Sequence, residues 1–129
     1  MSKNIVFTEN APAPIGPYNQ AVWAGNMLFV SGQIAINPET GEMEDETIES
    51  ETRQVMENLR AILEEADLSF DNVVKASIFL ENMDDFNRVN GIYGQYFDDD
   101  NAPARETVEV SRLPKEVNIE ISVIAIDND

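Results

Sequence analysis

The stretch QVMENLRAILEEADLSFDNVVKASIFL (54–80) decides the fold, because the spacing of its apolar residues changes within it. In the first half they recur three or four positions apart, which predicts a helix with one buried face. These side chains are Val55, Leu59, Ile62, Leu63 and Ala66. VVKASIFL (73–80) is rich in β-branched residues and predicts a strand with Val74, Ala76, Ile78 and Leu80 on one face. A helix followed at once by a strand indicates a helix packed on a sheet.

The first helix is expected from about Thr47 to Ala66. Its acidic residues fall largely off the apolar stripe and predict a solvated face. They are Glu49, Glu51, Glu57, Glu64 and Glu65. Asp67 follows where Gly would be commonest, and Asp tolerates the left-handed backbone conformation better than most residues.

The flanking segments supply four more strands and one more helix. Residues 20–34 predict two strands separated by the turn at 24–26. A second helix is predicted from Asp84, as N-cap, to about Phe97, and strands follow over 104–110 and 117–125. The order is ββ-α-β-α-ββ, an α+β layout with two helices packed on one face of a sheet. The length of 129 residues predicts one domain over 1–129.

The composition excludes several kinds of chemistry. The chain has no Cys, so it has no disulfide, thiolate nucleophile or Cys-type zinc site. It has no His, which excludes a Ser-His-Asp triad and imidazole acid–base catalysis. Any reaction must therefore use carboxylates, Arg, Lys, Tyr, hydroxyls or backbone groups.

The formal net charge is −17, from 25 Asp and Glu against 8 Lys and Arg. This field repels phosphate backbones and anionic membranes, so neither is expected as a partner. Because high salt would screen the self-repulsion, we hypothesise a salt-rich cytoplasm as the source. The N-terminus lacks the apolar run of a signal peptide, and no apolar stretch is long enough to span a membrane, so a cytoplasmic location is expected.

Alternation in the last two strands assigns side chains to faces of the sheet. Alternate residues from Val117 to Ala125 form the apolar face that the helices would cover, and Glu120 points the other way. Arg105 and Thr107 share a face opposite Val108, which we expect to be the open face that also carries Glu120. This open face is either a solvated surface with ordinary salt bridges or a pocket completed by another subunit. In the pocket, Arg105 would hold a substrate carboxylate and Glu120 would serve a proton or a water.

Two loop segments offer further candidate residues. Tyr18 in IGPYNQAV (15–22) presents a phenol before a strand, either as an aromatic plug or as part of a site. Ser31-Gly32 ends a strand, and Gly32 either forms a simple bulge or lets a ligand approach the backbone.

The acidic run 98–100 lacks defined metal-ligand spacing, which favours solvated charge over a cation site. We therefore expect no metal.

Six segments together resemble the RidA (YjgF) family of reactive-intermediate deaminases. They are IGPYNQAV (15–22), FVSGQI (29–34), NPETGE (37–42), VVKASIFLENMDDFNRVNGIYGQYF (73–97), PARETVEVSRLPKE (103–116) and VNIEISVIA (117–125). They run in family order over essentially the whole chain. The resemblance implies a chorismate-mutase-like α+β fold with a mixed six-stranded sheet. It also implies a homotrimer with its sites in the clefts between subunits.

The resemblance implies an activity, the hydrolysis of 2-iminobutanoate and 2-iminopropanoate to 2-keto acids and ammonia without metal or cofactor. By position, Arg105 matches the carboxylate-binding Arg of the PAR motif, and Glu120 matches the Glu associated with the attacking water. The substrate-binding positions of the family match a further set in this chain. They are Tyr18, Ser31, Gly32, Asn90 and Thr107.

The chain departs from the family pattern at three positions. Thr107 replaces the Cys that many bacterial deaminases carry, so any role of that thiol is absent. Glu106 replaces a small Ser, and Ala102 stands where an aromatic residue commonly precedes PAR. The last change would widen the mouth of the pocket or alter the substrate range.

Two other functions compete with the deaminase. The same trimer could bind small carboxylates as a regulatory module without turning them over, which needs mainly Arg105 rather than both Arg105 and Glu120. Family members have also been described as acting on RNA, but this sequence has no basic patch and no His.

Overall fold

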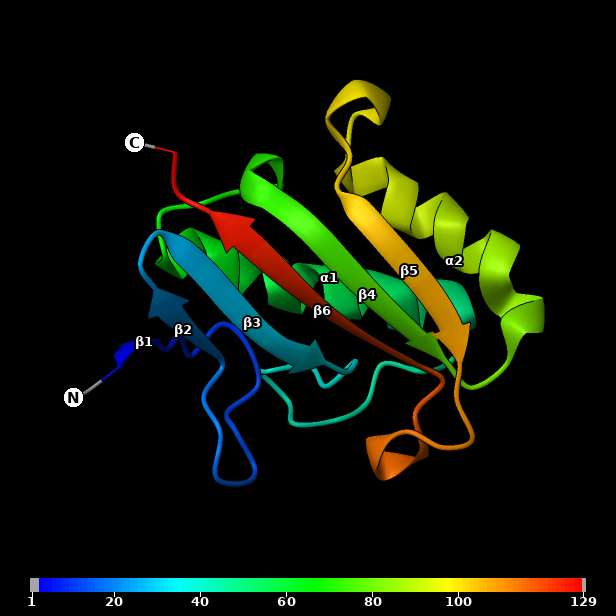
Figure 1. Cartoon of the computed structure of the whole chain (residues 1–129). Coiled ribbons are helices and arrows are strands. Elements are labelled where there is room, and N and C mark those ends of the chain that lie inside the picture. The colour runs from blue at the N-terminus through cyan, green and yellow to red at the C-terminus, as the bar shows by residue number, and fades with distance from the viewer. Residues whose placement is uncertain (1–2, 129) are drawn as a thin grey trace.

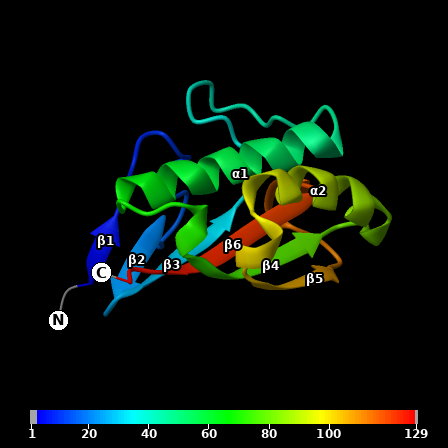
Figure 2. The ribbon, with the colours of Figure 1, turned by 90° about the horizontal axis from the view of Figure 1, so that it is seen from above.

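Two helices cover one face of a six-stranded mixed sheet and leave the other face open (Figures 1 and 2). This computed structural model describes residues 3–128. The strands are β1 (Asn4–Val6), β2 (Ala21–Ala24), β3 (Met27–Gln33), β4 (Val73–Leu80), β5 (Ala104–Glu109) and β6 (Ile119–Ile126). The helices are α1 (Ile48–Glu65) and α2 (Phe86–Tyr93), and short 3-10 turns join several elements. The predicted α+β layout is confirmed.

The strand order is β1-β2-β3-β6-β4-β5, so the strand made last lies in the middle of the sheet. The pair β4 and β5 is parallel, with α2 in the connection between them, and the other neighbouring strands are antiparallel. β1 was not among the predicted strands, because three residues are too few to show an alternating pattern.

Helix α1 begins where the sequence predicted it. Thr47 is its N-cap, and the Ser50 N–H donates to the Thr47 hydroxyl at 3.0 Å, while Ser50 Oγ accepts from the Thr47 N–H at 3.1 Å. One expectation for this helix is wrong. Glu51 is fully buried, and its carboxylate accepts from the backbone N–H and the side-chain amide of Asn118, both at 2.8 Å. This pairing ties α1 to the segment that leads into β6.

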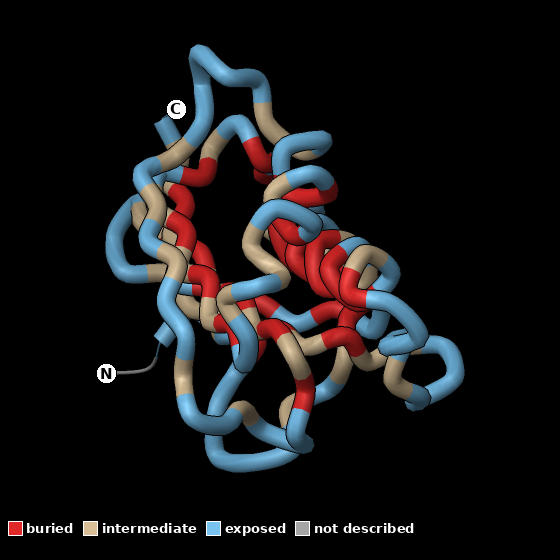
Figure 3. Tube along the Cα trace, turned by 90° about the vertical axis from the view of Figure 1, so that its right-hand side faces the viewer, coloured by how far each residue is buried: buried red, intermediate tan, exposed pale blue. Residues whose placement is uncertain are grey.

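The core lies between the helices and the sheet, as the inward-facing buried segments in Figure 3 show. Ala76, Ile78 and Leu80 of β4 are buried there as predicted. Val74 is 44% exposed instead, because the register between β4 and β6 shifts just before Lys75. Asp67 has φ 59°, which confirms the left-handed residue expected after α1.

The second helical segment is less regular than predicted. The range 84–97 divides into a 3-10 turn (Met83–Asp85), α2 and another 3-10 turn (Gly94–Tyr96). The predicted cap is also wrong, because Asn82 caps the segment and its Oδ1 accepts from the Asp84 N–H at 2.9 Å. Within residues 3–128, no helix combines the length and the apolar character needed to cross a membrane.

Candidate active site

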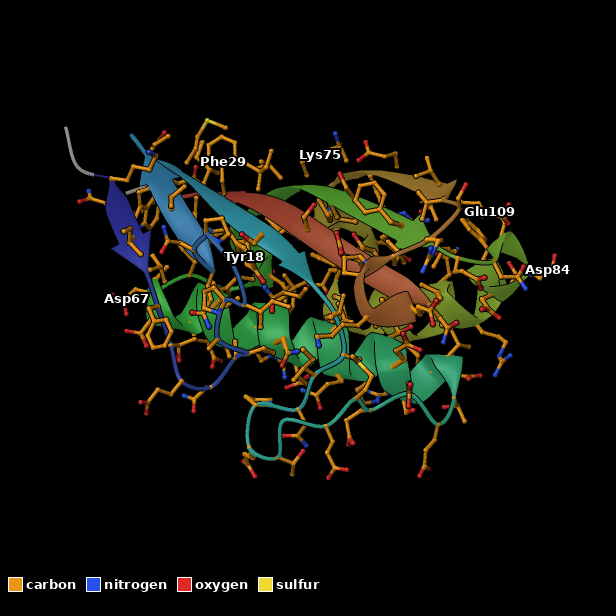
Figure 4. The ribbon with its side chains drawn as sticks, turned by 90° about the horizontal axis from the view of Figure 1, so that it is seen from below. Tyr18, Phe29, Asp67, Lys75, Asp84 and Glu109 are labelled. Atoms are coloured by element: carbon orange, nitrogen blue, oxygen red, sulfur yellow. The ribbon has the colours of Figure 1, made fainter. Side chains whose placement is uncertain are left out.

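The open face of the sheet carries a cavity of about 370 Å³ where β3 meets β6. Four of the predicted site residues line it together, namely Tyr18, Ser31, Gly32 and Glu120. Ile15, Ile34 and Pro114 complete the wall. Figure 4 shows Phe29 and Lys75 on this same face, away from α1.

Glu120 enters the cavity because β6 alternates. Ile119 and Ile121 are fully buried under the helices, so the residue between them points to the open face. Gly32 makes room for it, since a Cβ at Gly32 would lie only 2.7 Å from the Glu120 Cδ. Ser31 fixes the loop that carries Tyr18, because its hydroxyl donates to the Asn19 carbonyl at 2.5 Å. Because of the short distance from position 32 to the Glu120 side chain, a glycine is required at position 32 for the carboxylate to pack there.

The surroundings of Glu120 favour its protonated form more than water would. The side chain is about half buried, and this desolvation raises its pKa above the ordinary value of 4.5. Among residues 3–128 no donor hydrogen-bonds to its carboxylate, so nothing offsets the burial. A carboxyl in such a position is suited to accept and return a proton.

Arg105 lies on the opposite face of the sheet, contrary to the prediction. In the parallel register it pairs with the buried Ala76, so its side chain projects under α2. There its Cζ lies 5.6 Å from the ring centroid of Phe86 and 5.0 Å from that of Tyr93. Its Nη1 donates to the Asn90 Oδ1 at 2.7 Å. Asn90, a predicted site residue, is thus brought to Arg105 and not to Glu120.

Thr107 follows Arg105 to the helix side, because it pairs with the buried Ile78. Its hydroxyl is buried, and within the described chain it has no hydrogen-bond partner. The hydroxyl of Tyr93 is buried and unpartnered in the same way. Burial raises the pKa of Tyr93 to about 12, although the charge of Arg105 opposes this shift. The phenol is therefore neutral at physiological pH.

The guanidinium of Arg105 has no carboxylate within 4.0 Å among residues 3–128. Its positive charge is held by ring faces and an amide oxygen, which orient the group without neutralising it. Phe86 and Tyr93 were not among the candidate residues, because both are apolar positions of a helix that is expected to pack on the sheet. Their seven-residue spacing fits a core stripe and a cation cradle equally well.

The acidic run Asp98–Asp100 is exposed, and no set of three or more potential metal ligands gathers anywhere within the described range 3–128.

The predicted site residues form two groups on opposite faces of one sheet. The carboxylate group comprises Tyr18, Ser31, Gly32 and Glu120. The guanidinium group comprises Asn90, Arg105 and Thr107 with Phe86 and Tyr93.

Comparison with known proteins gives consistent matches along the chain. The family model described as Endoribonuclease L-PSP matches residues 8–127. A RutC family protein of Pyrococcus horikoshii is 54% identical over 123 residues, which cover 95% of this chain and 97% of that protein. A 2-iminobutanoate/2-iminopropanoate deaminase of Escherichia coli is 49% identical over 128 residues, 98% of each chain.

Solved structures share the fold closely. A Yersinia pestis protein of the conserved Rid family has a TM-score of 0.94 at 47% identity. Escherichia coli TdcF with bound serine has a TM-score of 0.91 at 41% identity. Each comparison covers 98% of this chain and all of the other.

Proposed function

This chain belongs to the Endoribonuclease L-PSP family, which includes the RidA (YjgF) proteins, and from that membership we propose that it hydrolyses small 2-imino acids to 2-keto acids and ammonia. The substrates would be 2-iminobutanoate and 2-iminopropanoate, which arise when pyridoxal-phosphate dehydratases act on threonine and serine. An Escherichia coli relative with that activity in its name is 49% identical over nearly the whole chain. We expect the protein to act in the cytoplasm.

The observation that carries this proposal is the pair of chemically complementary groups around Arg105 and Glu120. Arg105 offers two parallel N–H donors with no carboxylate partner in the described chain, which suits a substrate carboxylate. Glu120 offers a half-buried carboxyl with a raised pKa, which suits a proton carrier beside a water. That a structural relative, TdcF, was solved with bound serine supports a site for small carboxylates in this fold.

We place the complete site between subunits of a homotrimer. Arg105 and Glu120 lie on opposite faces of one sheet, so one chain cannot bring both to the same substrate. A neighbouring copy seated on the open face would bring its Arg105 to this chain's Glu120. The open face has apolar side chains for such a contact, since Phe29 is 39% exposed and Val108 is 40% exposed.

The reaction needs only these groups and a water. Arg105 of one copy fixes the substrate carboxylate, and Glu120 of the other takes a proton from the water as its oxygen attacks the imine carbon. The product of attack is a carbinolamine. Glu120 then returns that proton to the nitrogen and accepts the proton of the carbinolamine hydroxyl as the C–N bond breaks. This leaves a 2-keto acid and ammonia, and the ammonia takes the remaining proton from Glu120 and departs as ammonium. A protonated imine is already electrophilic, so the proposal uses no metal or cofactor.

A coupled assay tests the proposal. A dehydratase generates 2-iminobutanoate from threonine, and formation of 2-ketobutanoate is followed with and without this protein. An acceleration that disappears in both Arg105→Ala and Glu120→Gln supports the deaminase. No acceleration at low or high salt would refute it.

The binding-only trimer and the RNA-directed activity give different results in the same experiments. A binding module would hold 2-ketobutanoate without turnover, and Glu120→Gln would leave that binding intact. RNA cleavage is disfavoured by the net charge of −17, which repels phosphates. We expect any trace of RNA cleavage to disappear on further purification.

A further inference from the structure

A second cavity of about 400 Å³ adjoins the one that holds Glu120. Its walls are largely apolar, and among residues 3–128 the one charged residue that lines it is a lysine. The principal lining residues are Pro12, Ile15, Ile36, Pro38, Met43 and Lys115. Ile15 lines both cavities. A small hollow of about 30 Å³ is lined by residues of both, so the two cavities are neighbours along the 12–18 loop.

The backbone holds Lys115 at this cavity in an unusual conformation. Lys115 has φ 56° and ψ 20°, and Glu116 after it has φ 54°. Left-handed conformations at two successive residues with side chains are strained, and such strain persists only where the surrounding structure imposes it. The preceding residue, Pro114, lines the Glu120 cavity, so this turn directs neighbouring residues into different cavities.

The charge of Lys115 is uncompensated within residues 3–128. No carboxylate lies within 4.0 Å of its ammonium group, and no Asp or Glu is among the residues lining the cavity. The adjacent Glu116 is engaged elsewhere, because Arg112 Nη2 pairs with its Oε1 at 3.1 Å. Lys115 is exposed, so its ammonium group is open to a ligand at the cavity.

We propose that this second cavity binds a small organic anion with an aliphatic body, whose carboxylate pairs with Lys115. The apolar walls would take the hydrocarbon part and the ammonium group would select for the negative charge. All the lining residues belong to one chain, so binding requires neither Arg105, Glu120 nor turnover of an imine. The proposal therefore stands apart from the proposed reaction.

Hexanoate is the probe, titrated into the full-length protein at constant ionic strength while the methyl NMR signals of Met43 and Ile36 are followed. We expect saturable shifts at both residues in the millimolar range. Lys115→Gln should weaken binding about tenfold, the effect of losing one charge-assisted hydrogen bond. Lys115→Arg should retain binding. Lys3→Gln is the matched control, because it removes the same charge from a residue outside both cavities.

The ligand controls separate this site from the other possibilities. Hexanol, which lacks the charge, should bind much more weakly than hexanoate. The shifts should persist in Arg105→Ala, which removes the unpaired cation of the proposed active site. Absence of shifts at Met43 and Ile36, or equal binding of hexanoate by Lys115→Gln, would overturn the proposal.

Discussion

Within residues 3–128 the guanidinium of Arg105 forms no salt bridge, although acidic residues outnumber basic ones 25 to 8 in this chain. The reason is its position, since the rings of Phe86 and Tyr93 and the amide of Asn90 surround it and no carboxylate of the described chain reaches it. A lysine could supply the charge at this place but not the planar pair of donors.

We therefore expect Arg105→Ala to lower kcat/KM for 2-iminobutanoate about a hundredfold or more, the effect of losing a bidentate charge-assisted contact. Arg105→Lys should recover only part of the loss. Arg112→Ala is the control, because Arg112 is exposed and paired with Glu116. Equal activity of Arg105→Ala and the wild type in the coupled assay would contradict the assigned role.

The raised pKa of Glu120 predicts a direction for the pH dependence. A base acts in its deprotonated form, so kcat/KM should rise with pH as Glu120 loses its proton, with a midpoint above 4.5. Glu120→Gln should abolish this rise together with most of the activity. The measurement is a pH series of initial rates with the imine held well below KM, and a midpoint at or below 4.5 would contradict the prediction.

At the scale of the elements, Gly32 lets β3 lie close to β6 at the point where the Glu120 side chain leaves the sheet. Gly32→Ala would put a Cβ 2.7 Å from the Glu120 Cδ, so the flexible carboxyl must move while the strands stay paired. We expect kcat to fall by up to about a hundredfold, since small misplacements of a reacting group cost that much. Chemical denaturation should detect little loss of stability.

Gly91→Ala provides a contrasting substitution in α2. A Cβ at Gly91 meets nothing within 4 Å, and Ala is favoured over Gly in a helix by about 1 kcal/mol. This variant should be slightly more stable and keep its activity. If both glycine variants lost activity alike, the loss at Gly32 could not be assigned to displacement of Glu120.

The sequence predicted most of the elements but not the face on which Arg105 lies. Alternation in β6 predicted the buried face of that strand correctly, because every second residue from Ile119 to Ala125 is apolar. β5 is an edge strand in which no residue is fully buried. Alternation therefore predicted that Arg105 and Thr107 share a face, but it could not identify which face of the sheet that is. The assumption that Val108 faces the core was wrong: Val108 is exposed, and the Arg105 guanidinium lies against the rings of α2 instead.

Glu51 was mispredicted for a related reason. A carboxylate beside an apolar stripe is normally solvated, and only the tertiary structure reveals the Asn118 donors that allow it to be buried. Tyr18, Ser31, Gly32 and Glu120 were all candidates, and the structure gathers them around one cavity.

At the scale of the whole molecule, opposite-face placement predicts complementation between two inactive variants. Arg105→Ala and Glu120→Gln subunits mixed during refolding should form active sites wherever an intact Arg105 meets an intact Glu120. In a random equal mixture about a quarter of the sites qualify, so about a quarter of the activity should return. Light scattering on the wild type should give the mass of a trimer. No recovery from mixed trimers would place both residues of each site in one subunit.

The net charge of −17 makes the stability of the molecule dependent on salt. We expect the free energy of unfolding to rise steadily from low to molar KCl, because screening reduces repulsion among the acidic side chains. The measurement is a series of urea transitions at increasing KCl. A flat response would refute the hypothesis of a salt-rich source.

The strand order also constrains how the chain can fold while it is being synthesised. β6 alone joins β3 to β4, so a nascent chain holds two unconnected partial sheets until residues 119–126 have emerged from the ribosome. Leu80 and Ile126 are 46 residues apart, which corresponds to roughly 2–10 s of translation. Throughout that interval β3 and β4 each present an unpaired edge. A premature stop before Ile119 would leave both edges open permanently and yield a product prone to aggregation.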